Sequence, residues 1–193
     1  MIQSKNDYLY YLECDKIALR KSTLKPRFKH DIIWSFQRLL RKCEYYENCK
    51  RGLYNKLLGK WFKYRYVCLS QKLGFSIGFN TCGPGLCIEH YGLVIINQLA
   101  KVGANCRICG DVVIGAVGDD LVPTIGNNVF IGVGAKIIGG VKIADNVCIG
   151  ANAVVVKDIL EKGITVGGVP AHKISNNDSL KYITNATHIS ESD

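Results

Sequence analysis

A six-residue period in the second half of the chain limits what it can fold into. Large aliphatic residues recur at this spacing, with one interruption: Ile96, Val102, Ile108 and Ile114, then Ile125, Ile131, Ile137, Ile143, Ile149 and Val155. Smaller apolar residues follow four positions after most of them: Cys106, Val112, Val129, Ala135, Val141, Val147 and Ala153. A two-sheet sandwich would alternate with a period of two, so this spacing indicates a different architecture.

A unit of six residues supplies one short strand and one corner, so three units complete a triangular coil. Glycine comes directly after several of the large residues, at positions 103, 115, 126, 132 and 150, and asparagine three after, at 105, 128, 146 and 152. Both residue types adopt the positive φ angles that turns require. No unit buries its apolar face alone, so stability must come from stacked coils. The chain is therefore predicted to be mainly β, a parallel β-helix.

The first 74 residues have a helical character instead. Glycine is rare there, and the apolar stripe Ile32, Ile33, Phe36, Leu39 and Leu40 has helical spacing, with Arg38, Arg41 and Lys42 off the stripe. Asp31 is placed to cap this helix, and Gly52 and Gly74 bound a second stretch over 53–73. We predict two or three helices, and three parts: a basic helical segment (1–74), a β-helix domain (75–174) and a C-terminal tail (175–193).

The positive charge is concentrated in the helical segment. Residues 1–74 hold 17 Lys and Arg against 6 Asp and Glu, and the remainder holds 8 against 10. We expect solvated helix faces here and no nucleic-acid partner. Cations at 56, 60, 63 and 65 interleave with Leu57, Leu58, Trp61 and Phe62, which leaves two alternatives open: peripheral contact with an anionic membrane, or packing on the coil or a partner subunit.

The chain is expected to be cytoplasmic, with the inner face of the membrane as its alternative location. No apolar run approaches the roughly 18–20 residues that a bilayer span needs. The N-terminus has neither the basic region nor the apolar core of a signal peptide. Nine cysteines without a small-scaffold spacing fit reduced thiols.

The repeat, followed by Gly167-Gly168-Val169-Pro170-Ala171, resembles the hexapeptide-repeat acyltransferase superfamily. Within it, the chain is most similar to the serine acetyltransferase-like branch, which also includes O-acetyltransferases of bacterial surface polysaccharides. The resemblance covers roughly residues 75–175. It implies a left-handed coil, a homotrimer with active sites between neighbouring coils, and acetyl-CoA as co-substrate. No metal is expected.

Acetyl transfer from a thioester to a hydroxyl needs a base and donors for the developing oxyanion. Histidine suits the base because its pKa lies near neutrality. His90 lies where the coil begins, and residues 83–92 resemble the catalytic segment of the family. We therefore predict His90 as the general base, against the alternative of a structural histidine, and Glu89 beside it as a substrate-binding residue. His30 and His188 lie outside any motif.

The resemblance also maps the acetyl-CoA contacts, along what is expected to be one corner of the coil. Ala116, Val133 and Ala151, each two residues after a large aliphatic position, correspond to the backbone contacts. Lys157 and Lys173 are candidate phosphate contacts, with His172 beside Lys173 and solvent exposure as the alternative.

The repeat fails once, between Ile114 and Ile125, where residues 115–124 form an insertion. The matching loop of serine acetyltransferases carries an adjacent Arg and His that hold the substrate carboxylate, and this chain has Leu121-Val122. The acidic residue that orients the histidine in those enzymes falls near Phe75. An apolar pair cannot neutralise a carboxylate.

These departures predict transfer to a sugar hydroxyl in bacterial surface polysaccharide biosynthesis, with Asp119 and Asp120 binding the sugar or simply solvated. The alternative is a serine O-acetyltransferase of cysteine biosynthesis. A metal-dependent or purely structural β-helix is a third reading. Cys106-Arg107-Ile108-Cys109 has a metal-like spacing, but no second pair completes a four-ligand site, so these cysteines are predicted to be structural.

Overall fold

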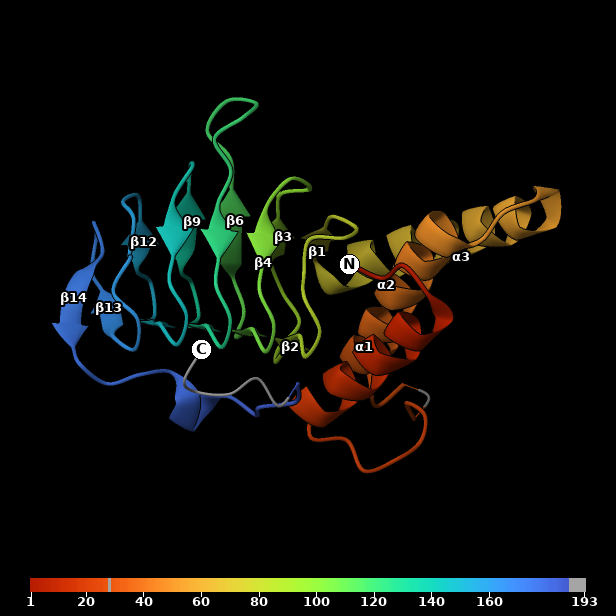
Figure 1. Cartoon of the computed structure of the whole chain (residues 1–193), viewed down its shortest axis with the longest axis horizontal. Coiled ribbons are helices and arrows are strands. Elements are labelled where there is room, and N and C mark those ends of the chain that lie inside the picture. Colours follow the sequence, from red (N-terminus) through yellow and green to blue (C-terminus); the bar gives the residue numbers. More distant parts are fainter. Residues whose placement is uncertain (28, 188–193) are drawn as a thin grey trace.

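Three helices cover one end of a β-solenoid in the computed structural model, which describes residues 1–27 and 29–187 (Figure 1). The helices are α1 (Lys5–Ala18), α2 (Ile32–Cys49) and α3 (Leu53–Leu73). Their bounds agree with the predicted helical segment, including the glycines before and after α3. The strands begin at Phe75, directly after Gly74.

Short strands follow one another around the solenoid, in three sheets. The five-stranded sheet, in spatial order, contains β1 (Phe75–Ile77), β3 (Val94–Ile96), β6 (Val112–Gly115), β9 (Lys136–Ile138) and β12 (Val154–Val155). The three-stranded sheet contains β10 (Lys142–Ile143), β7 (Thr124–Ile125) and β4 (Lys101–Val102). The six-stranded sheet contains β14 (His172–Ser175), β13 (Thr165–Gly167), β11 (Cys148–Ile149), β8 (Phe130–Ile131), β5 (Arg107–Ile108) and β2 (Cys87–Ile88).

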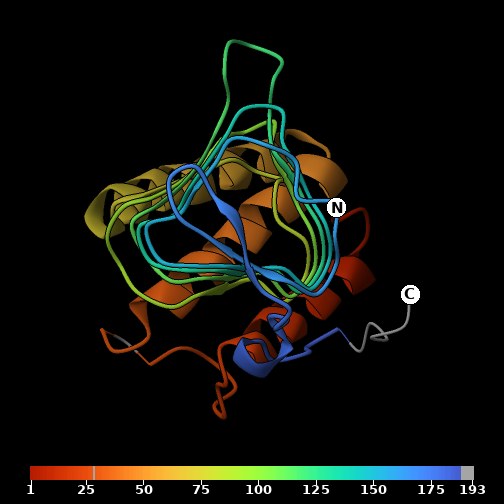
Figure 2. The ribbon, with the colours of Figure 1, turned by 90° about the vertical axis from the view of Figure 1, so that its left-hand side faces the viewer.

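Seen along its axis, the solenoid is a stack of triangular coils, and the left-handed β-helix is confirmed (Figure 2). The pairs Ile108–Ile131 and Ile131–Ile149 are in register in adjacent parallel strands. All ten positions of the large aliphatic row are at most 5% exposed, and so are all seven of the small row. The repeat therefore forms one continuous buried column.

The asparagines and glycines of the repeat are required for different structural reasons. Asn105, Asn128 and Asn146 adopt φ between +53° and +60°, as expected for the corners, and their side-chain amides form a ladder from coil to coil. The glycines after the large residues do not have positive φ, contrary to our expectation. At Gly103, a Cβ would lie 2.4 Å from the carbonyl oxygen of Gly126. Glycine is required there because adjacent coils approach closely.

Arg41 lies off the apolar stripe, as predicted, yet it is completely buried and not on a solvated helix face. Its guanidinium donates to Asp15 (2.9 Å) and Glu44 (3.2 Å), and to the carbonyl oxygens of Cys82 and Gly83. Asp15 also accepts from the backbone N–H groups of Gly85 and Leu86. This network joins α1 and α2 to the first coil.

Asp31 precedes α2, as predicted, but its carboxylate makes no capping hydrogen bond. It accepts instead from Arg27 (3.0 Å) and Lys21 (2.7 Å), in the connection between α1 and α2. Hydrogen bonds from Arg27, and then from Lys21, hold the pKa of Asp31 well below its usual range.

One face of α3 packs inward and the other does not. Phe62, Tyr66 and Leu73 are buried in the main core, whereas Leu57 and Trp61 are at least half exposed. The packing alternative therefore holds for the buried face alone. Within residues 1–27 and 29–187, no helix is long and apolar enough to cross a bilayer.

Close approach of the coils predicts opposite effects for two glycine substitutions. Gly103→Ala should lower the free energy of unfolding by about 2 kcal/mol, because the added methyl group collides with backbone. Gly59→Ala, in α3 with its nearest neighbour at 3.6 Å, should be neutral or stabilise by up to about 1 kcal/mol. Urea unfolding measures both. Equal stability of the two variants would contradict this explanation.

The buried network predicts that removing the charge of Asp15 lowers the free energy of unfolding substantially. Asp15→Asn leaves Arg41 with less compensating charge and should cost about 3 kcal/mol in urea unfolding. Glu13→Gln, which breaks an exposed pair with Lys16 on the same helix, should cost less than about 1 kcal/mol. The buried pair would be unimportant if Asp15→Asn were as mild as this control.

Candidate active site

His90 lies at the corner where the chain passes from β2 in the six-stranded sheet towards β3 in the five-stranded sheet. Its backbone N–H donates to the carbonyl oxygen of Cys109 on the next coil (3.2 Å), which fixes its place on the corner. The side chain is exposed, and no other described residue makes a hydrogen bond to the ring. Such an imidazole is accessible to a substrate hydroxyl.

Glu89, predicted to bind substrate, is held in an ion pair with Arg107. The Arg107 guanidinium donates to both carboxylate oxygens, through Nε at 3.0 Å and through Nη2. These hydrogen bonds lower the pKa of Glu89, and partial burial opposes them. Cys109 Sγ lies 3.7 Å from the same carboxylate. Glu89 is therefore an ionised, oriented acceptor.

The residues predicted to contact acetyl-CoA lie on two corners of the coil, not one as expected. Val133 and Ala151 follow β8 and β11, on the corner that also carries His90, and both are exposed. Ala116 follows β6 and Lys157 follows β12, at the other end of the strands of the five-stranded sheet. The outer face of that sheet lies between these two corners.

Lys157 and Lys173, the two predicted phosphate contacts, differ in whether a carboxylate already pairs with them. Lys173 on β14 pairs with Glu161 at 2.5 Å, which competes with any phosphate. In the part of the chain that the structure describes, exposed Lys157 has no ion-pair partner. His172 is exposed beside Lys173, with Nδ1 3.4 Å from the carbonyl oxygen of Pro170. Lys157 is the better placed of the two lysines for an anion.

The insertion at 115–124 projects from the coil as a loop between β6 and β7 (Figure 1). It closes with a hydrogen bond from the Val117 N–H to the Leu121 carbonyl oxygen (3.0 Å). Asp119 and Asp120 are exposed in the loop, and Leu121 is 56% exposed. The loop starts from the corner opposite that of His90 and contains no Lys or Arg.

A cavity of about 290 Å³, which our sequence analysis did not predict, lies over the outer face of β2 and β5. Its lining includes Glu89, Tyr91 and Arg107 from the coil and Arg20 and Trp34 from the helical segment. Arg20 and Trp34 stand outside any motif, and no local pattern indicates that they meet the coil.

The cysteines do not gather into a metal site. Among residues 1–27 and 29–187, no group of three or more His, Cys, Asp or Glu side chains is placed to hold a metal ion. Cys106 is buried in the small apolar row, and burial raises the pKa of its thiol well above the ordinary value.

Residues 123–157 match the sequence family described as "Bacterial transferase hexapeptide (six repeats)". Among curated proteins, the chain is similar to a serine acetyltransferase of Helicobacter pylori strain J99: 39% identical over 115 residues, covering 55% of this chain and 67% of that protein. A serine acetyltransferase of Synechococcus elongatus is 40% identical over 95 residues, covering 48% of this chain and 38% of the relative. The matched segment thus spans 67% of the length of the first relative and 38% of the length of the second.

Solved structures of serine acetyltransferases also resemble this chain. A Neisseria gonorrhoeae serine acetyltransferase in complex with serine has a TM-score of 0.64 at 26% identity, covering 89% of this chain and 71% of that chain. A Brucella abortus serine acetyltransferase in complex with coenzyme A has a TM-score of 0.63 at 24% identity, covering 89% of this chain and 68% of that chain. At this identity the similarity shows the fold alone.

These comparisons overturn the prediction of a sugar acceptor in surface polysaccharide biosynthesis. The relatives at 39–40% identity are serine acetyltransferases, and they do not support the polysaccharide O-acetyltransferase-like branch. That prediction depended on Leu121 and Val122, which lack a charge for a carboxylate. The missing charge in this loop was therefore not sufficient ground to predict a sugar acceptor.

The Glu89–Arg107 pair predicts a measurable pKa change. Arg107→Gln should raise the pKa of Glu89 towards its ordinary value of about 4.3, because the hydrogen bonds that favour the carboxylate are lost. The stabilisation from this pair is present above that pH and is lost as pH falls through the folded pKa. NMR of the Glu89 side-chain carboxyl carbon measures the shift. Arg65→Gln, on α3, is the control, and an unchanged Glu89 titration in Arg107→Gln would contradict the assignment.

Proposed function

This chain belongs to the hexapeptide-repeat transferases, and on that premise we propose that it is an acetyl-CoA-dependent serine O-acetyltransferase of cysteine biosynthesis. The observation that carries the proposal is His90, an exposed imidazole on a corner of the coil beside an oriented carboxylate. The serine acetyltransferase of Helicobacter pylori, 39% identical over 115 residues, supports the acceptor. The Neisseria gonorrhoeae relative in complex with serine supports it too.

His90 acts as the general base in the proposed reaction. As the serine hydroxyl oxygen attacks the thioester carbonyl carbon, the imidazole takes the hydroxyl proton, so that the nucleophile is not left as a charged oxonium. Donors stabilise the negative charge that develops on the carbonyl oxygen. The C–S bond then breaks, and the leaving thiolate of coenzyme A takes up the proton from His90. The products are O-acetylserine and coenzyme A.

The outer face of the five-stranded sheet suits acetyl-CoA. Ala151 is small and exposed, so a ligand can approach its main chain closely, and Val133 beside it is bulkier and 51% exposed. Lys157 offers an uncompensated cation for a phosphate. Ala116, where the loop begins, would border the same face. Lys173 would have to leave Glu161 to join them.

We also propose a homotrimer. His90 and the loop start from opposite ends of the strands of the five-stranded sheet, so one chain does not gather both around one point. A neighbouring copy, packed side by side, would bring its loop towards this corner. Acetyl-CoA as co-substrate and nine free cysteines favour a reducing, cytoplasmic location.

The purified full chain should release free thiol from acetyl-CoA when L-serine is added, and not with glycine, which has no hydroxyl. His90→Ala should lower kcat by about 10²- to 10⁴-fold, because the hydroxyl proton then has no acceptor. A thiol-reactive dye measures the rate, and mass spectrometry identifies O-acetylserine.

Lys142→Met serves as the control, since Lys142 is exposed on β10 in the three-stranded sheet, away from His90. Both variants should unfold at the wild-type temperature. Undiminished turnover in folded His90→Ala would refute the role of His90, and absence of any thiol release with L-serine would refute the acceptor.

A further inference from the structure

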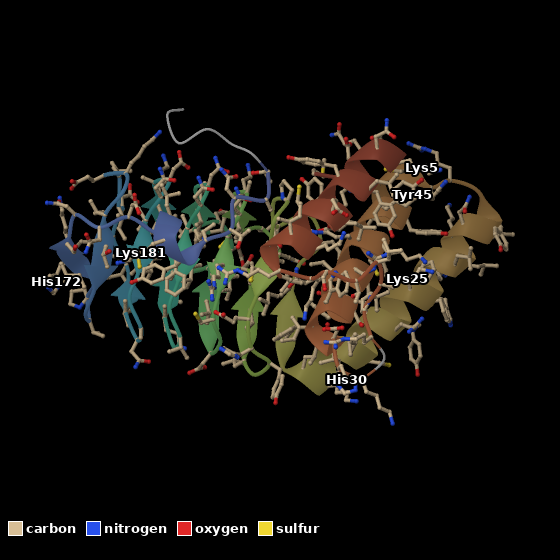
Figure 3. All side chains as sticks on the ribbon, turned by 90° about the horizontal axis from the view of Figure 1, so that it is seen from below. Lys5, Lys25, His30, Tyr45, His172 and Lys181 are labelled. Carbon is tan, nitrogen blue, oxygen red and sulfur yellow. The ribbon has the colours of Figure 1, made fainter. Side chains whose placement is uncertain are left out.

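Helix α3 lies at the end of the molecule farthest from β14 (Figure 1). Its main contacts within the chain are with α2 and with β1 of the first coil. Seen from below, α3 runs along one side of the helical segment (Figure 3). One side of this helix is therefore covered by the chain, and the opposite side faces outward.

The helix is apolar on both of these sides. Phe62, Tyr66 and Leu73 recur at helical spacing and are buried in the main core. A second row, which we call the outer stripe, recurs at helical spacing on the opposite side and is exposed: Leu53, Leu57, Trp61 and Tyr64. A helix that is apolar all round normally has apolar surroundings on every side. The chain supplies them on one side of α3.

The exposure of apolar side chains distinguishes α3 from α2. In α2, which the structure describes in full, no large apolar side chain is exposed. In α3 six of them are exposed: Leu53, Tyr54, Leu57, Trp61, Tyr64 and Val67. Single exposed apolar residues are common on protein surfaces, but a continuous stripe marks a surface that binds a partner or a membrane.

The charge along α3 has one sign, since the helix contains five Lys and Arg and no Asp or Glu. Lys56, Lys60 and Lys63 lie on one side of the outer stripe, and Arg65 and Lys72 lie on the other. Lys63 pairs with Glu47 (3.2 Å), and no carboxylate of the described residues pairs with the other four. Long basic side chains beside an apolar stripe reach anionic headgroups while their carbon chains stay on apolar surface.

This charge pattern disfavours a second copy of the chain as the occupant of the outer stripe. A two-fold interface brings identical surfaces together, so α3 would face α3 and the like charges would repel each other. An anionic bilayer supplies the opposite charge, and its boundary between headgroups and acyl chains accepts apolar side chains. Trp and Tyr are well suited to that boundary because each has an apolar ring and a polar atom.

We propose that the outer stripe of α3 docks on an anionic lipid bilayer. The helix lies in the plane of the membrane, with Leu53, Leu57 and Trp61 at the boundary between headgroups and acyl chains, and the cations on both sides bind the headgroups. The contact is peripheral, in keeping with the lack of a membrane-spanning helix among the described residues. It goes beyond the proposed acetyl transfer and does not depend on it.

Co-sedimentation of the full chain with lipid vesicles tests the role of the cations. The chain should bind vesicles of phosphatidylcholine and phosphatidylserine but not vesicles of phosphatidylcholine alone, and about 1 M NaCl should release it because salt screens the attraction. Lys56→Gln combined with Lys60→Gln should lower the partition coefficient about 10- to 30-fold, because each cation near an anionic surface contributes about fivefold. No co-sedimentation of wild type at low salt would overturn the proposal.

Lys101→Gln combined with Lys142→Gln is the matched control for charge. It removes the same charge from two exposed lysines of the three-stranded sheet, and it should bind as wild type does. If this pair weakened binding as much as the pair in α3, binding would follow net charge alone and the proposal would be wrong.

Leu57→Gln tests the apolar part of the contact. It should lower the partition coefficient about 10-fold, because a side chain that leaves water on docking becomes polar. Leu160→Gln, which changes an exposed leucine outside the helical segment, should have no effect. Both positions are exposed, so both variants should unfold at the wild-type temperature. Wild-type partitioning of Leu57→Gln would exclude the outer stripe as the docking surface.

Tryptophan fluorescence locates the contact on the molecule. The chain has two tryptophans, of which Trp34 is 1% exposed and Trp61 is 50% exposed. Trp61 alone passes from water to the membrane boundary on docking, so anionic vesicles should shift the emission to shorter wavelength. Trp61→Phe should still co-sediment but lose this shift. A shift of the same size in Trp61→Phe would place the contact elsewhere.

Sedimentation velocity without lipid tests the competing occupant. Wild type and Leu57→Gln should have the same molar mass, because the outer stripe is not an interface between copies of the chain. If Leu57→Gln has a smaller mass and wild type does not bind anionic vesicles, a second copy covers the stripe and the proposal is overturned.

Discussion

The column of aliphatic side chains inside the coil is the constraint on which the rest of the structure depends. Each of its residues packs on the equivalent residues of adjacent coils, and a one-residue slip would turn the row outward. An insertion can therefore leave the coil only at a corner, as the loop at 115–124 does. The same register places His90 on one corner and Ala116 on another.

The helical segment is attached to this rigid stack through buried charge. Desolvation of Arg41, Asp15 and Glu44 is costly and is offset because hydrogen bonds to Cys82, Gly83, Gly85 and Leu86 satisfy the remaining donors and acceptors. This network holds the end of α1 and the middle of α2 against the first coil. The cavity lined by Arg20 and Trp34 is a consequence of that attachment.

The loop explains why the acceptor was predicted wrongly. Leu121 and Val122 lack the charge that a carboxylate needs, and the physical argument against a carboxylate in that loop still holds. It did not exclude a cation from elsewhere in the fold. Arg20 is 70 residues before His90 in the sequence, yet it lines the cavity that Glu89 and Tyr91 also line. No motif in the sequence indicates this proximity.

The sequence by itself determined the β-helix, the extent of α3 and the position of His90, because a period of six and a helical stripe are local patterns that repeat. Only the tertiary structure decided that Arg41 is buried, that glycines such as Gly103 serve close approach, and that the residues predicted to contact acetyl-CoA lie on two corners. It alone brought Arg20, Trp34 and Glu89 to one cavity. The physical reason is that these features depend on contacts between residues about 20 to 70 positions apart, which leave no periodic trace in the chain.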